Sequence, residues 1–166
     1  MIDNGVTVKD QSFANLNEEI VKSGSGRQLI LLGDMNGRTG RKTGGTVVGN
    51  FWEDRVNVNG ERLIEVCTQT SLKIWNGVFN HKNVHKYTWE QHTKNLKTII
   101  DYIITKQDLK QKMQDVRTYR GPNCGADHKL LVAKILFPFM YTTKDKHKEK
   151  KENTITMVDK KRKYNT

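Results

Sequence analysis

Five polar side chains in this sequence stand beside apolar runs and are of types that can perform hydrolytic chemistry. Asp34 and Asn36 follow one apolar run, Asp101 interrupts a second, and Asp127 and His128 precede a third. Carboxylate oxygens bind hard cations such as Mg²⁺, and a carboxylate beside an imidazole fixes its tautomer. We predict that Asp34 takes a proton from water and that Asp127 binds the cation. His128, held by Asp101, would face a phosphate, so the expected reaction is phosphodiester hydrolysis.

The spacing of Asp34 and Asn36 has two interpretations. The run 28–32 that precedes them is expected to be a strand buried on both faces. Residues two apart on an extended chain point the same way, so both side chains would face one pocket at the end of that strand. Asp and Asn also bond readily to nearby backbone, and the alternative is that the pair only shapes a turn.

Hydrophobic periodicity predicts the elements that must position these residues. Helices are expected at 11–22 and at 60–70, the second capped by Asn59. A carboxylate inside an apolar strand is costly unless it is bonded, so Asp101 should have a dedicated partner. Further strands are expected at 72–75, 87–90, 98–105, 116–119 and 130–137, with a glycine-rich loop at 37–50.

The chain is strongly basic. A formal net charge of +11 over 166 residues makes DNA a natural partner, although lysines that only solvate the surface give the same count. Residues 139–166 are Lys-rich without apolar periodicity, so we expect a disordered tail after a domain at 1–138. Cys67 and Cys124 indicate no disulfide framework, and we find no secretory signal or membrane-spanning run. We therefore expect no membrane partner and a reduced intracellular compartment, nuclear or cytoplasmic.

Three weaker motifs have competing explanations. The glycine-rich loop ends in Lys42-Thr43, but Arg41 stands where a phosphate-binding P-loop requires Gly, which disfavours nucleotide binding. His81 and His85 are four apart, as metal ligands would be, yet no Cys or acidic ligand is near in sequence, which favours surface histidines. The basic run 160–163 is either a nuclear import signal or part of a solvated tail with non-specific DNA affinity.

Five short motifs stand in order along the chain. They are Leu-Leu-Gly-Asp-Met-Asn-Gly-Arg-Thr-Gly (31–40), Asn-Gly-Glu-Arg-Leu-Ile-Glu-Val-Cys (59–67), Tyr-Thr-Trp (87–89), Ile-Asp-Tyr-Ile-Ile (100–104) and Gly-Ala-Asp-His (125–128). Their order resembles that in the endonuclease/exonuclease/phosphatase superfamily, and the resemblance covers roughly residues 13–136. It is closest to the endonuclease of RTE-type non-LTR retrotransposons, a group that includes craniofacial development protein 2-like sequences.

The resemblance implies an α/β (α+β) fold and a magnesium-dependent site, with Mn²⁺ as an alternative ion. The implied fold is the second lobe of a four-layered α/β sandwich. In that family the residue matching Asp34 activates the attacking water. The other implied roles are as follows: Asn36 helps to hold water and phosphate, Asp127 belongs to the metal site, His128 stabilises the pentacoordinate phosphorus, and Asp101 supports that His. Trp89 matches an aromatic on the nucleic-acid side, where it could stack on a base; a core or rim aromatic is the competing interpretation.

Only the second half of that family's fold is expected here. No strand-flanked Asn or Glu precedes Gln28, so the metal site should be incomplete. The face of the sheet that normally packs on the first half should be exposed, and a missing first half or another chain would be needed to cover it. We therefore expect a truncated DNA endonuclease with weak or no activity alone. The alternatives are a non-catalytic nucleic-acid-binding remnant and a small-molecule phosphoesterase.

Overall fold

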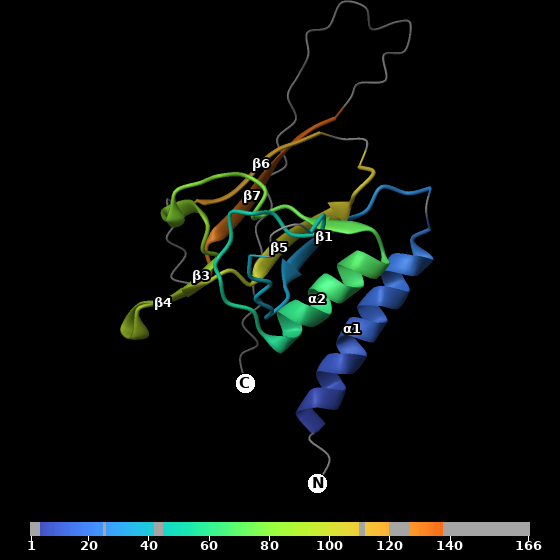
Figure 1. Ribbon diagram of the computed structural model, residues 1–166, viewed down its shortest axis with the longest axis horizontal. Helices are drawn as coiled ribbons and strands as arrows, with labels where there is room; N and C mark the ends of the chain where they lie inside the picture. Colours follow the sequence, from blue (N-terminus) through green and yellow to red (C-terminus); the bar gives the residue numbers. More distant parts are fainter. Residues whose placement is uncertain (1–3, 25, 42–44, 110–111, 120–126, 138–166) are drawn as a thin grey trace, which may run out of the picture.

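Two helices lie side by side on one face of a small sheet (Figure 1). They are α1 (Asn4–Lys22) and α2 (Val58–Gln69) in a computed structural model that describes residues 4–24, 26–41, 45–109, 112–119 and 127–137. The helix predicted at 11–22 therefore begins earlier, at Asn4. Cys124, Lys42-Thr43 and the Lys-rich residues 139–166, with the predicted disorder and import signal of that tail, lie outside the described residues.

The N-cap of α2 differs from the prediction. The side chain of Asn57, with extended backbone, accepts a hydrogen bond from the amide of Gly60 at 2.9 Å. Asn59, the predicted cap, lies inside the first helical turn instead. An N-cap side chain reaches the amide three residues ahead, and Asn57 has the required spacing to Gly60.

The central sheet is antiparallel, with strand order β1-β5-β2. Its strands are β1 (Ile30–Asp34), β2 (Leu72–Ile74) and β5 (Asp101–Lys106). The register pairs Asp34 directly with Asp101 at one end of the β1–β5 ladder. Two acids that are distant in sequence thus meet at the same edge of the sheet.

The predicted burial of the first strand on both faces is wrong. All five residues of β1 are only partly buried, because in the described residues this strand has a ladder partner on one side alone, β5. The predicted strand 98–105 is divided in two, since β4 (Leu96–Thr98) pairs with β3 (Trp89–Gln91) and the sheet strand begins only at Asp101. The β3–β4 hairpin projects away from the helices (Figure 1).

A second hairpin, β6 (Lys112–Tyr119) and β7 (Leu130–Leu136), packs on the other side of the sheet. Two short 3₁₀ turns, η1 (Asn83–His85) and η2 (His92–Lys94), complete the described elements. The helices and the antiparallel sheets confirm the predicted α+β class. None of the helices in the described part of the chain is long and apolar enough to cross a membrane.

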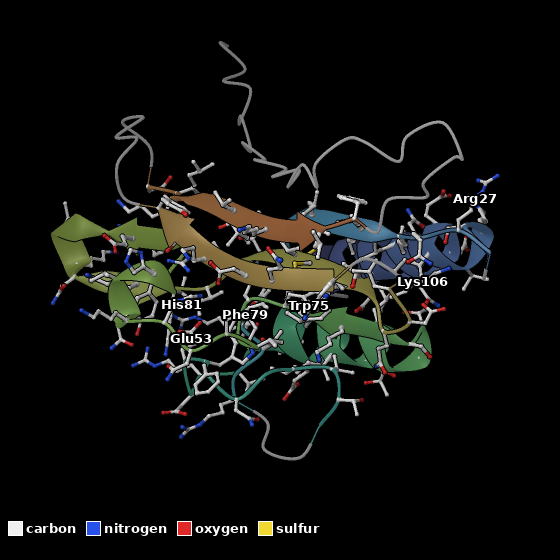
Figure 2. The ribbon with its side chains drawn as sticks, turned by 90° about the horizontal axis from the view of Figure 1, so that it is seen from above. Arg27, Glu53, Trp75, Phe79, His81 and Lys106 are labelled. Carbon is white, nitrogen blue, oxygen red and sulfur yellow. The ribbon has the colours of Figure 1, made fainter. Side chains whose placement is uncertain are left out.

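Alternating residues of β5 enter two different cores. Ile104 packs between sheet and helices with Leu63 and Cys67, all three with no exposed surface. Ile103 packs on the opposite face, against β6–β7 and against Trp75 and Phe79, whose rings lie side by side (Figure 2). Each such side chain contributes about 1.5–3 kcal/mol of hydrophobic stabilisation. The hairpin thus covers part of the sheet face that the sequence predicts to be exposed.

Candidate functional site

Strand pairing brings three ionisable residues together at the end of the sheet. The β1–β5 register sets Asp34 against Asp101, and an isolated bridge pairs Trp89 with His128. Backbone bonds flank that bridge on both sides: the Glu90 amide donates to the Asp127 carbonyl at 2.9 Å, and the Lys129 amide donates to the Thr88 carbonyl at 2.7 Å. The position of His128 is therefore fixed by its backbone as well as its side chain.

The imidazole of His128 lies between the two carboxylates. Its Nδ1 is 3.2 and 3.1 Å from the two carboxylate oxygens of Asp101, and its Nε2 is 4.0 Å from Oδ2 of Asp34. Because a carboxylate only accepts, Nδ1–H is the donor, and Nε2 is the ring nitrogen that faces Asp34. The side chains of Asp34, Asp101 and His128 are 16%, 10% and 18% exposed. Asp101 thus has the dedicated partner that its place in an apolar strand required.

Asp101 is held by a buried threonine as well as by His128. The hydroxyl oxygen of Thr88, a residue with no exposed surface, accepts hydrogen bonds from the amides of Ile100 (3.0 Å) and Asp101 (3.1 Å). Burial raises the pKa of the Asp101 carboxyl group, while hydrogen bonding to Thr88 and the charge of His128 oppose that rise. Thr88 therefore fixes both the backbone and the carboxylate of the residue that orients His128.

We expect Thr88→Val to lower the free energy of unfolding by about 1–3 kcal/mol, because the two amides would lose their buried acceptor. Thr88→Ser keeps the hydroxyl and serves as the matched control; it should cost less than Thr88→Val. Urea denaturation followed by tryptophan fluorescence measures both variants. A Thr88→Val chain that is no less stable than the Thr88→Ser chain would contradict the role of the hydroxyl.

The pKa of Asp101 gives a pH prediction. Because burial raises it above the ordinary value of 3.8, the folded state holds the proton more tightly than the unfolded chain. The resulting stability is fully present below that value and is lost as pH rises through the raised pKa. Asp101→Asn stays neutral, so its stability relative to the native chain should increase as the pH rises from below 3.8 through the raised pKa of Asp101. A difference in unfolding free energy that is constant across this range would contradict the prediction.

Asn36 is held by its backbone at the mouth of the site. It has a left-handed conformation (φ 46°), and its amide donates to Oδ1 of Asp34 at 2.8 Å. The Nδ2 groups of Asn57 and Asn59 donate to its carbonyl at 3.3 and 3.2 Å. The two interpretations of the Asp34/Asn36 spacing are therefore compatible: one oxygen of Asp34 shapes the turn while the other lies toward His128.

Asp127 and Trp89 contact one another at the rim. The indole Nε1 of Trp89 donates to Oδ2 of Asp127 at 2.6 Å, and Asp127 is exposed. Among the described residues, the ligand atoms that lie within 4.8 Å of one another belong to Asp34, Asp101 and His128. The assignment of Asp127 to a metal ion stays a prediction.

A cavity of about 500 Å³ opens at this edge of the molecule. Three of the residues that line it were given no functional role in the sequence analysis: Arg38, Asn57 and Thr98. Arg38 and Thr98 belong to no recognised pattern of catalytic residues, whereas the spacing of Asn57 to Gly60 is a capping signal. The lining residues are Asp34, Asn36, Arg38, Asn57, Trp89, Thr98, Ile100 and His128.

The histidine pair of the sequence has another role. Nε2 of His81 lies 2.7 Å from Oδ1 of Asp115 on β6, and Nδ1 of His85 lies 3.0 Å from the Thr118 carbonyl. No group of metal-ligating side chains in the described part of the chain includes either histidine. They attach the η1 segment to β6, and the side chain of His81 is only 13% exposed, so it is less of a surface residue than predicted.

Two curated proteins are similar to this chain. Craniofacial development protein 2 of Bos taurus is 37% identical over 106 residues, which make up 64% of this chain and 18% of that protein. Craniofacial development protein 2 of Tragulus javanicus is 36% identical over the same length and the same shares. The chain thus spans about a fifth of the length of these relatives. No family model and no solved structure matches the chain.

Proposed function

We propose that this pocket belongs to a metal-dependent phosphodiesterase that hydrolyses DNA, of the retrotransposon-endonuclease type within the endonuclease/exonuclease/phosphatase superfamily. The observation that carries the proposal is the imidazole of His128, bonded to Asp101 through Nδ1 and directed through Nε2 toward Asp34. The five ordered motifs support the same assignment, as does the similarity to craniofacial development protein 2. Weak activity of the chain alone is part of the proposal.

The donor set fits a hard divalent cation. Ligand atoms of two carboxylates and an imidazole lie within 4.8 Å of one another, and oxygen ligands suit Mg²⁺ or Mn²⁺. By resemblance Asp127 would hold the ion. When bound, the ion supplies charge stabilisation at the phosphate.

In this proposal, proton transfer, orientation of the water and contact with the phosphate are assigned to side chains of this chain. Asp34, 16% exposed and fixed by the Asn36 amide, takes a proton from water through its second oxygen. The side chain of Asn36 helps to orient that water. His128 presents Nε2 to the phosphate, to which a protonated Nε2 would donate, and Asp101 fixes the orientation of the ring through Nδ1.

Nicking of supercoiled plasmid tests the proposal. The native chain should nick slowly with Mg²⁺ or Mn²⁺ and stop when the ions are removed with a chelator. Asp34→Asn should reduce the rate to background, whereas Asp54→Asn, which removes an exposed acid that pairs with Arg41, should not. A folded chain that retards DNA yet nicks no faster than Asp34→Asn in either ion would contradict the catalytic proposal.

The net charge of +11 favours a second candidate, non-catalytic binding of nucleic acid. This candidate predicts salt-sensitive retardation of DNA that is unchanged by Asp127→Ala and no nicking under any condition. Failure to retard DNA at low salt would exclude it.

A third candidate, a phosphoesterase acting on a small phosphate, predicts phosphate release from such a substrate without plasmid nicking.

A further inference from the structure

Arg38 is fixed on the wall of the cavity by contacts at both ends. Its amide donates to Oδ1 of Asn57 at 2.8 Å, and its carbonyl accepts from the Asn57 amide at 3.1 Å. Its guanidinium Nε donates to the hydroxyl of Thr98, and Nη2 lies 3.4 Å from the Lys97 carbonyl. An arginine held in this way loses little side-chain entropy on binding an anion.

The neighbouring carboxylate of Glu53 does not engage every N–H group of the Arg38 guanidinium. Oε1 of Glu53 accepts hydrogen bonds from the Thr98 hydroxyl at 2.8 Å and from the Ile99 amide at 3.1 Å. This oxygen therefore holds the segment where β4 ends and the chain continues toward β5. Oε2 of Glu53 forms an ion pair with Nη2 of Arg38 at 3.6 Å, which is longer than a hydrogen bond. The contacts of Arg38 within the described residues engage Nε and Nη2, which leaves the two N–H groups of Nη1 for a ligand.

The same cavity is lined by Asp34 and His128, and its volume of about 500 Å³ exceeds the space that one phosphate group needs. We propose that Arg38 forms a second anion subsite, which binds a phosphate neighbouring the one that lies against His128. Planar guanidinium groups suit phosphate oxygens because they offer parallel N–H donors. The substrate class that satisfies both positions is a polynucleotide strand, whose phosphates repeat at short intervals. This inference rests on the proposed function of the pocket.

Binding of short thymidine nucleotides tests the subsite without any cleavage. The probes are dTdT, with one phosphodiester, and pdTdT and dTdTp, each with one further phosphate, titrated in the presence of a chelator. The indole N–H signal of Trp89 reports binding. The native chain should bind pdTdT or dTdTp about two- to ten-fold more tightly than dTdT. Equal affinity for all three probes would overturn the proposal.

Matched variants identify the residue responsible. Arg38→Gln should abolish the preference for the extra phosphate, whereas Arg41→Gln makes the same charge change at an exposed arginine that pairs with Asp54 and should retain it. If Arg38→Gln fails to fold, Glu53→Gln replaces it, since Gln still accepts from the Ile99 amide. This variant should strengthen the preference because it removes the negative charge that pairs with Arg38, and an unchanged preference would contradict the subsite.

The readout separates this inference from the proposed function. A preference for the second phosphate that depends on Arg38, in a chain that never nicks plasmid, supports the subsite and contradicts the catalytic proposal. Metal-dependent nicking by a chain that binds dTdT and pdTdT equally would support the catalysis and overturn the subsite.

Discussion

A His128→Gln variant is expected to cleave plasmid about 10²–10⁴-fold more slowly than the native chain, the usual range for loss of a positioned acid–base or charge-stabilising group. The reason is geometric. Gln can keep a bond to Asp101, but it places no second ring nitrogen where Nε2 now lies, 4.0 Å from Asp34. Initial nicking rates at saturating Mg²⁺ measure the effect.

His81→Gln is the matched control for this variant. His81 is likewise a partly buried histidine bonded to an aspartate, Asp115, but it does not line the cavity. The control should cleave at a rate within a few-fold of the native chain. Similar losses in both variants would assign the effect to general destabilisation and would remove His128 from the mechanism.

Gly60→Ala is expected to lower the free energy of unfolding by about 1–3 kcal/mol, the cost of forcing an atom into a packed contact. A Cβ at Gly60 would lie 1.8 Å from the carbonyl oxygen of Arg38 and 2.3 Å from its carbonyl carbon. Both are backbone atoms, so relief requires movement of the segment that carries Asn36 and Arg38. The helix propensity of Ala works in the opposite direction by up to about 1 kcal/mol.

Gly26→Ala controls for the general effect of adding a methyl group, since a Cβ there has no neighbour within 4 Å. Its free energy of unfolding, measured in urea, should stay within about 0.5 kcal/mol of the native value. Gly60→Ala should also weaken binding at the Arg38 wall, because the same backbone forms it. A Gly60→Ala chain as stable as the Gly26→Ala chain would show that the α2 N-terminus does not constrain the site.

The parts of the fold that follow local patterns could be predicted from the sequence. Apolar periodicity located both helices and most strands, and the carboxylate in the apolar run 100–104 indicated a buried partner for Asp101. That partner, His128, is confirmed by the contact between Nδ1 and the carboxylate. The roles assigned to Asp34, Asn36, Asp127 and Trp89 stay predictions, although Asp34, Asn36 and Trp89 line one cavity.

The features that depend on distant contacts could not be predicted. Thr88 holds Asp101 across 13 positions and Arg38 holds Thr98 across 60, and no local spacing encodes either pair. The division of the strand at 99–100 has a tertiary cause, because Thr98 pairs with Trp89 in the hairpin while Asp101 pairs with Asp34 in the sheet. The N-cap was assigned two residues late because Asn57 and Asn59 are both of a capping type.

The central claim is that Asp101 fixes His128 so that Nε2 is directed toward Asp34. Nitrogen NMR of the imidazole, assigned by comparison with His128→Gln, tests it most directly because it needs neither metal nor activity. We expect a proton on Nδ1 of His128 at neutral pH, and a mixture of tautomers in Asp101→Ala. A proton on Nε2 alone, or a tautomer unchanged by Asp101→Ala, would contradict it.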